Sequence, residues 1–201
     1  MNFTIIEDCS PYYIRFTHDG IDNVISKSLS FIEQNKFKTH FTHYVFPLNE
    51  AIEILSVVPM TSLIELNPNR VSIFVTPPGI YYKAHKDGRD PDHHYSLNYT
   101  VKILDQECVT NWYSDEDLKD YELDMKVYLR YSRECLNFDK SKHTPLKSMT
   151  ALQGECILFN TEIYHDFDNS KSINERMVLT LRDINPADVY FEDIKKVIFN
   201  K

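Results

Sequence analysis

The feature that most limits how this chain can fold is a series of short extended segments in its middle, each ended by residues that break strands. Val71–Thr76 reads Val-Ser-Ile-Phe-Val-Thr and is stopped by Pro77-Pro78-Gly79. Extended structure resumes over Ile80–His85, and Tyr95–Leu104 then alternates polar and apolar residues with the period of two that a strand requires. This pattern predicts a β-rich protein, and the abundance of aromatic residues (13 Tyr and 12 Phe) agrees with it.

Further strands and two amphipathic helices are expected on either side of these segments. The strands are expected over Asn2–Ile6, Tyr12–Phe16, Cys108–Tyr113, Gly154–Phe159, Tyr164–Phe167 and Arg176–Arg182. Apolar residues recur at helical spacing over Ile21–Gln34, which predicts a helix. Pro47–Val58 is predicted as a second helix whose buried stripe is Ala51, Ile52, Leu55 and Val58. We expect both helices to brace the outside of a sheet.

The chain of 201 residues suits one domain with a single core, because neither an internal repeat nor a linker divides it. We expect a single domain over 1–201. Strands and bracing helices are expected over 1–70, and a β core with an insert at 114–148 is expected over 71–183. The tail over 184–201 is expected to form a short helix and could add a final strand. The insert separates two motif-bearing halves, which is where a lid or substrate loop would sit.

Composition narrows the class of partner. The formal net charge of −8 repels nucleic acid and anionic membranes at a distance, so a nucleic-acid substrate is disfavoured. The four cysteines form no CxxC pair and are expected to be reduced thiols. The N-terminus lacks the pattern of a signal peptide, and no apolar run reaches the length of a membrane span. We therefore expect a cytoplasmic protein that does not enter a membrane.

Three residues could together bind a metal ion. His85 and Asp87 are two residues apart at the end of a predicted strand, so in an extended chain their side chains point to the same side. His165 follows the apolar run Cys156–Phe159 much later in the sequence. Two imidazoles and one carboxylate, with other positions left open, form the facial triad that holds non-haem Fe(II). Each part alone has an ordinary alternative: Asp87 could cap a turn, and His165 could be a structural histidine.

Arg176 stands at the start of the last predicted strand and requires an anion. Alternation places Arg176, Val178, Thr180 and Arg182 on one face of that strand, and Met177, Leu179 and Leu181 on the core face. An arginine that points into a half-enclosed barrel needs an anionic partner, and a dicarboxylate co-substrate would supply one. The alternative is a surface salt bridge to Glu175 or Asp183, and Arg182 is a competitor for the anchoring role.

These residues resemble the 2-oxoglutarate- and Fe(II)-dependent dioxygenases, and among them the aspartyl/asparaginyl β-hydroxylase-like branch. The segment Gly154–Phe159, followed by His165, Asn169-Ser170 and Arg176-Met177-Val178-Leu179, is similar to that branch's pattern of distal His, Asn-Ser pair and co-substrate-binding Arg. The segment from Pro78-Gly79 to His85-Lys86-Asp87 is similar to its His-x-Asp strand. The resemblance covers roughly Val71 to Asp183.

The resemblance implies a fold and a set of roles. The fold is mainly β with flanking helices: a double-stranded β-helix, or jelly-roll, of cupin-like type. His85, Asp87 and His165 would bind Fe(II), and Arg176 would bind the distal carboxylate of 2-oxoglutarate. Where the branch carries Arg-x-His, this chain has Ser96-Leu97-Asn98, so that Ser96 and Asn98 could bind the same group without charge. The Arg-x-Ser of many other members is Arg176-Met177-Val178 here and lacks the hydroxyl.

The activity implied is hydroxylation of an unactivated C–H bond, with O2 consumed and succinate and CO2 released. The prime substrate is not identified, and a protein side chain or a small metabolite is favoured. Two other interpretations stay open. One is a non-catalytic jelly-roll that binds a small dicarboxylate or a protein partner. The other is a cupin-like enzyme that uses another metal for isomerisation or hydrolysis.

Overall fold

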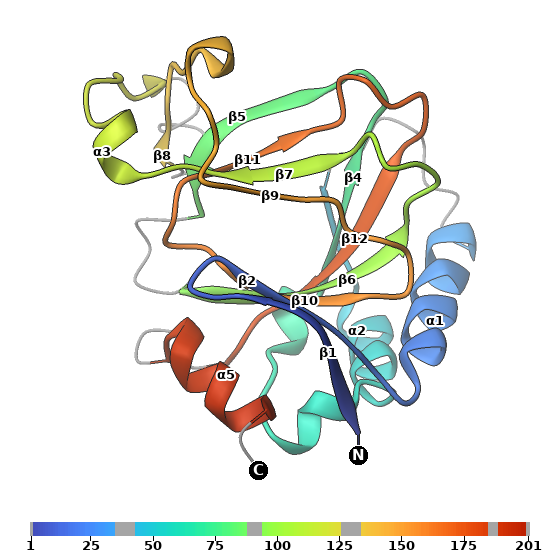
Figure 1. Cartoon of the computed structure of the whole chain (residues 1–201). Coiled ribbons are helices and arrows are strands. Elements are labelled where there is room, and N and C mark those ends of the chain that lie inside the picture. Colours follow the sequence, from blue (N-terminus) through green and yellow to red (C-terminus); the bar gives the residue numbers. More distant parts are fainter. Residues whose placement is uncertain (1, 35–42, 88–93, 126–133, 185–188, 200–201) are drawn as a thin grey trace.

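Two antiparallel β-sheets face each other, and helices cover the outer side of the larger one (Figure 1). The computed structural model describes residues 2–34, 43–87, 94–125, 134–184 and 189–199. In these residues the larger sheet has the order β1 (Phe3–Cys9), β2 (Tyr13–His18), β10 (Cys156–Asn160), β6 (Tyr95–Lys102), β12 (Arg176–Leu181), β4 (Ser72–Thr76) and β3 (His43–Val45). The smaller sheet has the order β8 (Glu134–Cys135), β5 (Tyr81–Lys86), β11 (His165–Asp168), β7 (Val109–Trp112) and β9 (Lys147–Met149). The expected jelly-roll, mainly β with flanking helices, is confirmed.

The helices supply one wall of the main core. They are α1 (Ile21–Gln34), α2 (Leu48–Leu55) and α5 (Phe191–Phe199), with the short 3₁₀ turns η1 (Pro59–Ser62) and η2 (Pro68–Arg70) between α2 and β4. Their apolar stripes pack against the outer face of the larger sheet, where Tyr99, Leu158 and Leu179 are fully buried. A buried side chain of this size contributes roughly 1.5–3 kcal/mol through loss of water contact. The main core therefore lies outside the space between the two sheets.

The predicted helix boundaries hold better than the predicted stripe of α2. The first helix spans Ile21–Gln34 as expected. The second is shorter than expected, and Ile52 is 53% exposed, so its assignment to the buried stripe is wrong. Ile54 takes its place beside Ala51 and Leu55, which is the spacing i, i+3 and i+4 of one helix face, and Val58 is buried as expected although it lies beyond the end of α2. In the tail, the helix α5 spans Phe191–Phe199, and residues 185–188 and 200–201 lie outside the described part of the chain.

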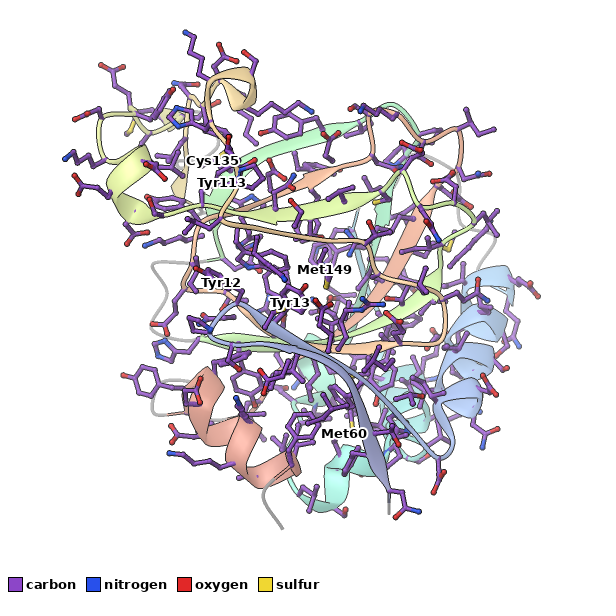
Figure 2. All side chains as sticks on the ribbon, viewed as in Figure 1. Tyr12, Tyr13, Met60, Tyr113, Cys135 and Met149 are labelled. Carbon is purple, nitrogen blue, oxygen red and sulfur yellow. The ribbon has the colours of Figure 1, made fainter. Side chains whose placement is uncertain are left out.

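A second core fills one end of the space between the two sheets. Tyr13 stacks on Trp112 with ring centroids 4.8 Å apart, and Trp112 also lies 5.2 Å from Phe159. Figure 2 shows Tyr13 and Met149 between the sheets, whereas Met60 lies on the helix side of the larger sheet. Aromatic pairs of this kind contribute about 0.5–1.5 kcal/mol beyond their buried area. This packing closes one end of the sandwich and leaves the other end for a cavity.

The insert over 114–148 packs on the outside of the smaller sheet in its described part. It contributes α3 (Asp115–Leu118), β8, the 3₁₀ turn η3 (Lys140–Lys142) and the start of β9, while residues 126–133 lie outside the described residues. Leu118, Leu136 and Phe138 form a third apolar cluster with Ala84 and Tyr113. The described part of the insert thus adds the edge strand β8 next to β5, which carries His85, and packs an apolar cluster against the sheet.

Two further expectations concern thiols and membranes. All four cysteines are free thiols in the structure, as expected from their spacing. Among the described residues, no helix has the length and apolar character needed to span a bilayer.

A buried histidine makes the fold sensitive to acid. Burial of His18 in the main core lowers its pKa below 6.5, although the neighbouring Asp19 opposes this shift. The unfolded chain therefore takes up a proton below about pH 6.5 that the folded protein does not, so stability is full above that pH and falls as the pH decreases.

We expect His18→Gln to remove this component. Between pH 7.5 and 5.5, with chelator present, the wild type should lose up to about 1 kcal/mol more free energy of unfolding than the variant. Urea denaturation at the two pH values measures the difference. Equal losses in the two proteins would show that His18 does not titrate as its burial requires.

Candidate metal centre

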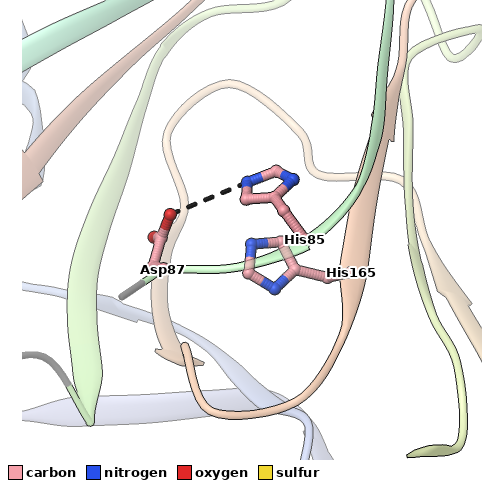
Figure 3. A group of neighbouring side chains, drawn as sticks. All are labelled: His85, Asp87 and His165. Carbon is pink, nitrogen blue, oxygen red and sulfur yellow. Dashed lines mark ion pairs between the residues drawn. The ribbon is translucent and has the colours of Figure 1, made fainter. Parts of the chain in front are cut away.

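Three side chains from distant parts of the sequence meet between the sheets: His85, Asp87 and His165. His85 lies near the end of β5, and Asp87 follows it on the same side, as the two-residue spacing requires. His165 opens β11 and is the cross-strand partner of His85. One ligand atom from each of the three residues lies within 4.8 Å of those from the other two. Figure 3 shows both imidazoles with a ring nitrogen turned toward the Asp87 carboxylate, whose Oδ1 is 3.6 Å from Nε2 of His85.

The hydrogen bonds of the two histidines leave the right nitrogen for a metal. Nδ1 of His85 lies 2.8 Å from the carbonyl oxygen of Lys83, and Nδ1 of His165 lies 2.8 Å from that of Ile163. A carbonyl oxygen can only accept, so Nδ1 donates and Nε2 of each neutral ring keeps its lone pair. A backbone carbonyl that holds Nδ1–H is the usual outer partner of a metal-binding histidine. The donor set therefore fits a divalent transition metal.

Behind His165, a buried carboxylate fixes the strand that carries it. Asp166 points to the opposite face of β11 and is fully buried. It accepts hydrogen bonds from Tyr113 Oη (2.6 Å), Asn111 Nδ2 (2.8 Å) and Tyr81 Oη (3.2 Å). Burial raises the pKa of Asp166, and these three donors act against that shift. The network connects β5, β11 and the end of β7. It therefore stabilises the strand register in which His165 pairs with His85.

His85 and Asp87 of this group line a cavity of about 590 Å3. Its volume is within the range of small-molecule sites. The larger sheet contributes the side chains that line one wall, including Phe74, Thr76, Ser96, Asn98, Arg176, Val178, Thr180 and Arg182. The smaller sheet contributes aromatic and cationic side chains from β5 and β11, and Asp124 and Cys135 reach the cavity from the insert.

Arg176 lies in the cavity wall, is 5% exposed, and has no carboxylate partner among the described residues. Its guanidinium carbon is 4.9 Å from the ring centroid of Phe167, and its Nε makes no hydrogen bond. Burial lowers the pKa of Arg176, and the neighbouring Cys108 thiol opposes this shift. The alternative of a surface salt bridge is wrong: Glu175 pairs with Lys102 at 2.8 Å, and Asp183 accepts a hydrogen bond from Tyr95. A buried cation of this kind requires an anion from elsewhere.

The strand alternation predicted for the last strand is correct. Arg176, Val178, Thr180 and Arg182 all line the cavity, while Leu179 and Leu181 are fully buried in the main core. Ser96 and Asn98 line the same wall from β6, and Asn98 is the cross-strand partner of Thr180. Both are therefore placed where they could contact a ligand that reaches Arg176.

Asn169 connects two turns at the edge of this wall through hydrogen bonds. Its fully buried side-chain amide donates to the carbonyl oxygens of Pro77 (2.9 Å) and Asn174 (2.9 Å). Its backbone also exchanges hydrogen bonds with the turn at Gly79, which has φ +75°. The first turn leads into β5, and the second leads into β12. The Asn169 side chain thus connects the turn before the strand of His85 to the turn before the strand of Arg176.

Sequence reasoning missed the main contact of Arg182. Its Nη2 lies 3.1 Å from Oδ2 of Asp87, and its Nη1 donates to the Tyr95 carbonyl oxygen at 3.3 Å. The alternation of β12 indicated that Arg182 shares a face with Arg176, but alternation does not show which arginine meets which carboxylate. The contributions of Thr76, Asp124 and Cys135 to the cavity had no sequence pattern that could have revealed them.

Comparison with known proteins supports the fold. No family model matches the sequence, and no curated protein sequence is similar to it. Solved structures do match. EvdO2 from Micromonospora carbonacea var. aurantiaca, complexed with 2-oxoglutarate, has a TM-score of 0.54 at 12% identity, covering 85% of this chain and 86% of that one. HygX from Streptomyces hygroscopicus, with nickel and 2-oxoglutarate bound, has a TM-score of 0.53 at 11% identity, covering 86% and 83%. At these identities the likeness shows that this chain shares their fold.

The single tryptophan of the chain can report on metal binding. Trp112 is fully buried and is the cross-strand partner of His165. A transition metal held by His165 would therefore quench its fluorescence at short range. We expect saturable quenching by Ni(II) or Co(II) with a stoichiometry of one.

His165→Ala should weaken this binding by more than the roughly 10- to 100-fold that loss of an outer partner causes. His143→Ala is the matched control, since His143 contacts Tyr121 in the insert, and it should quench like the wild type. If His165→Ala gives the wild-type titration curve, the metal is not bound at this group.

Proposed function

We propose that this protein is a 2-oxoglutarate- and Fe(II)-dependent oxygenase that hydroxylates an unactivated C–H bond. The observation that carries the proposal is one cavity lined by His85, Asp87 and a buried Arg176 that has no carboxylate partner among the described residues, with His165 grouped beside His85 and Asp87. The first feature suits a metal with open positions, and the second suits a dicarboxylate. The fold shared with EvdO2 and HygX, whose structures hold 2-oxoglutarate, supports the same conclusion.

In this proposal, each residue of the site has a defined task. Nε2 of His85, Nε2 of His165 and Oδ1 of Asp87 would hold Fe(II), and Arg176 would bind the distal carboxylate of 2-oxoglutarate as a planar fork. Ser96 and Asn98, on the wall beside Arg176, would donate hydrogen bonds to the co-substrate. When bound, the iron and 2-oxoglutarate would reduce O2 and supply the oxidant, with succinate and CO2 as products.

The remaining cavity walls would position the substrate and exclude water. Phe74, Phe159 and Phe167 give the cavity a largely apolar lining, which suits a C–H bond held close to the metal. Lys83 and Asp124 also line the cavity, where they form an ion pair of 3.2 Å. A protein side chain or a small metabolite would fit such a space, and the net charge of −8 disfavours a nucleic acid. The aspartyl/asparaginyl β-hydroxylase-like branch stays a prediction.

Two other functions fit less well. A non-catalytic jelly-roll that binds a dicarboxylate would use Arg176, but it has no need for two histidines whose Nε2 atoms keep their lone pairs beside a carboxylate. A cupin-like isomerase or hydrolase would use the metal ligands but not a buried arginine in the same cavity. The oxygenase accounts for both features.

The proposal predicts turnover without knowledge of the prime substrate. Purified protein given Fe(II), ascorbate and O2 should convert 2-oxoglutarate to succinate, because the iron and the co-substrate carry out this step themselves. His85→Ala should abolish succinate formation, since it removes a metal ligand. Succinate measured by chromatography gives the rate.

His143→Ala is the control for this experiment and should keep the wild-type rate. Succinate formed equally well by His85→Ala would mean that the assigned site is not where the reaction occurs.

A further inference from the structure

We propose that Arg182 is a positioning residue for Asp87: it holds the carboxylate so that a single oxygen faces the metal position. The inference rests on the metal site proposed above and adds a residue to it. Arg176 opens β12 and Arg182 directly follows its end, and both line the cavity, yet their surroundings differ. Arg176 has no carboxylate partner among the described residues, whereas Arg182 is bound to a proposed metal ligand.

The two oxygens of Asp87 are divided between two partners. Oδ2 lies 3.1 Å from Nη2 of Arg182, and Oδ1 lies 3.6 Å from Nε2 of His85. The side chains of Arg182 and Asp87 are only 10% and 15% exposed, so solvent screens the pair weakly. With Oδ2 turned toward a cation, Oδ1 is the oxygen that Asp87 presents on the side of His85.

This division matters because the number of open metal positions decides what else can bind. A carboxylate can bind a metal through one oxygen or through both. Binding through both would take a position that a co-substrate or O2 needs on a facial triad. Arg182 therefore keeps that position open. It also keeps the Asp87 carboxylate in place before the metal arrives, which reduces the ordering needed on binding.

The guanidinium itself is held from a second side. Its Nη1 donates to the carbonyl oxygen of Tyr95, at the start of β6, and the Tyr95 hydroxyl donates to Asp183 at 2.9 Å. These contacts set the direction from which Arg182 approaches Asp87. They also define the competing explanation, in which Arg182 only ties the end of β12 to β6. That explanation predicts a loss of stability without a specific effect on the metal.

Metal binding distinguishes the two explanations without any use of catalysis. We would titrate metal-free protein with Co(II) and follow the visible Co(II) absorption, which gives the dissociation constant and reports the coordination number. Arg182→Gln keeps a donor for the Tyr95 carbonyl but loses the charge on Asp87. We expect its dissociation constant to rise about 10- to 100-fold, with an altered Co(II) spectrum. Arg182→Lys restores a charge without the planar fork, and we expect a smaller, several-fold rise.

The chain offers a matched control in a second buried ion pair. Arg15 in β2 meets Glu155 with Nη2–Oε1 at 2.6 Å and Nε–Oε2 at 2.9 Å, and the side chains are 16% and 8% exposed. Arg15→Gln should lower the melting temperature but leave the Co(II) dissociation constant unchanged. Melting curves of the metal-free variants show the structural cost of each substitution separately.

Several results would overturn the proposal. A dissociation constant of Arg182→Gln within twofold of wild type, or an equal weakening in Arg15→Gln, would assign Arg182 a structural role only. If Arg182→Gln does not fold, Arg182→Lys decides, and a wild-type constant there would reject the proposal. If wild-type protein lacks a saturable Co(II) site that His165→Ala removes, the metal site itself fails. That outcome is distinct from failure of the Arg182 inference alone.

Discussion

The pairing of His165 with His85 across two antiparallel strands is the contact on which the site depends. It brings together residues 80 positions apart, and the same register puts Trp112 on the other side of His165. A shift of one residue in β11 would turn His165 outward and bring Asp166 into the cavity. The buried Asp166 network opposes that shift, because the shift would break the three hydrogen bonds that Asp166 accepts. The hydrogen bonds of Asp166 thus stabilise the strand register that places His165 beside His85.

The arginines at the two ends of β12 show how the fold distributes positive charge around the cavity. Both are almost fully buried, which is expensive unless an anion is near. Arg182 has its anion within the chain, in Asp87. Arg176 lies beside the Phe167 ring and the Cys108 thiol and has no carboxylate partner among the described residues. A protein that keeps such a cation buried gains affinity for a carboxylate ligand when one enters.

Local patterns predicted α1, the line of residues along β12 and the strands other than the short β3, β8 and β9, because period and composition are properties of neighbouring residues. The exposure of Ile52 shows where this fails: two adjacent apolar residues compete for one helix face, and the choice depends on what the sheet presents to them. Local patterns also do not predict the contact between Arg182 and Asp87, because that contact depends on how β12 and β6 lie beside the end of β5. The convergence of His85, Asp87 and His165 was inferable from residue type and order together, and the structure brings these three together.

The central claim is that a metal triad and an arginine anchor serve one cavity. The most direct test is anaerobic titration of the Fe(II)-loaded protein with 2-oxoglutarate, followed by the visible metal-to-ligand charge-transfer band of the chelated co-substrate. Wild-type protein should develop the band saturably. Arg176→Met should need on the order of 100-fold more 2-oxoglutarate, because a charge-assisted pair is lost while the metal remains. Absence of the band in the wild type, or an unchanged 2-oxoglutarate requirement in Arg176→Met, would contradict the account.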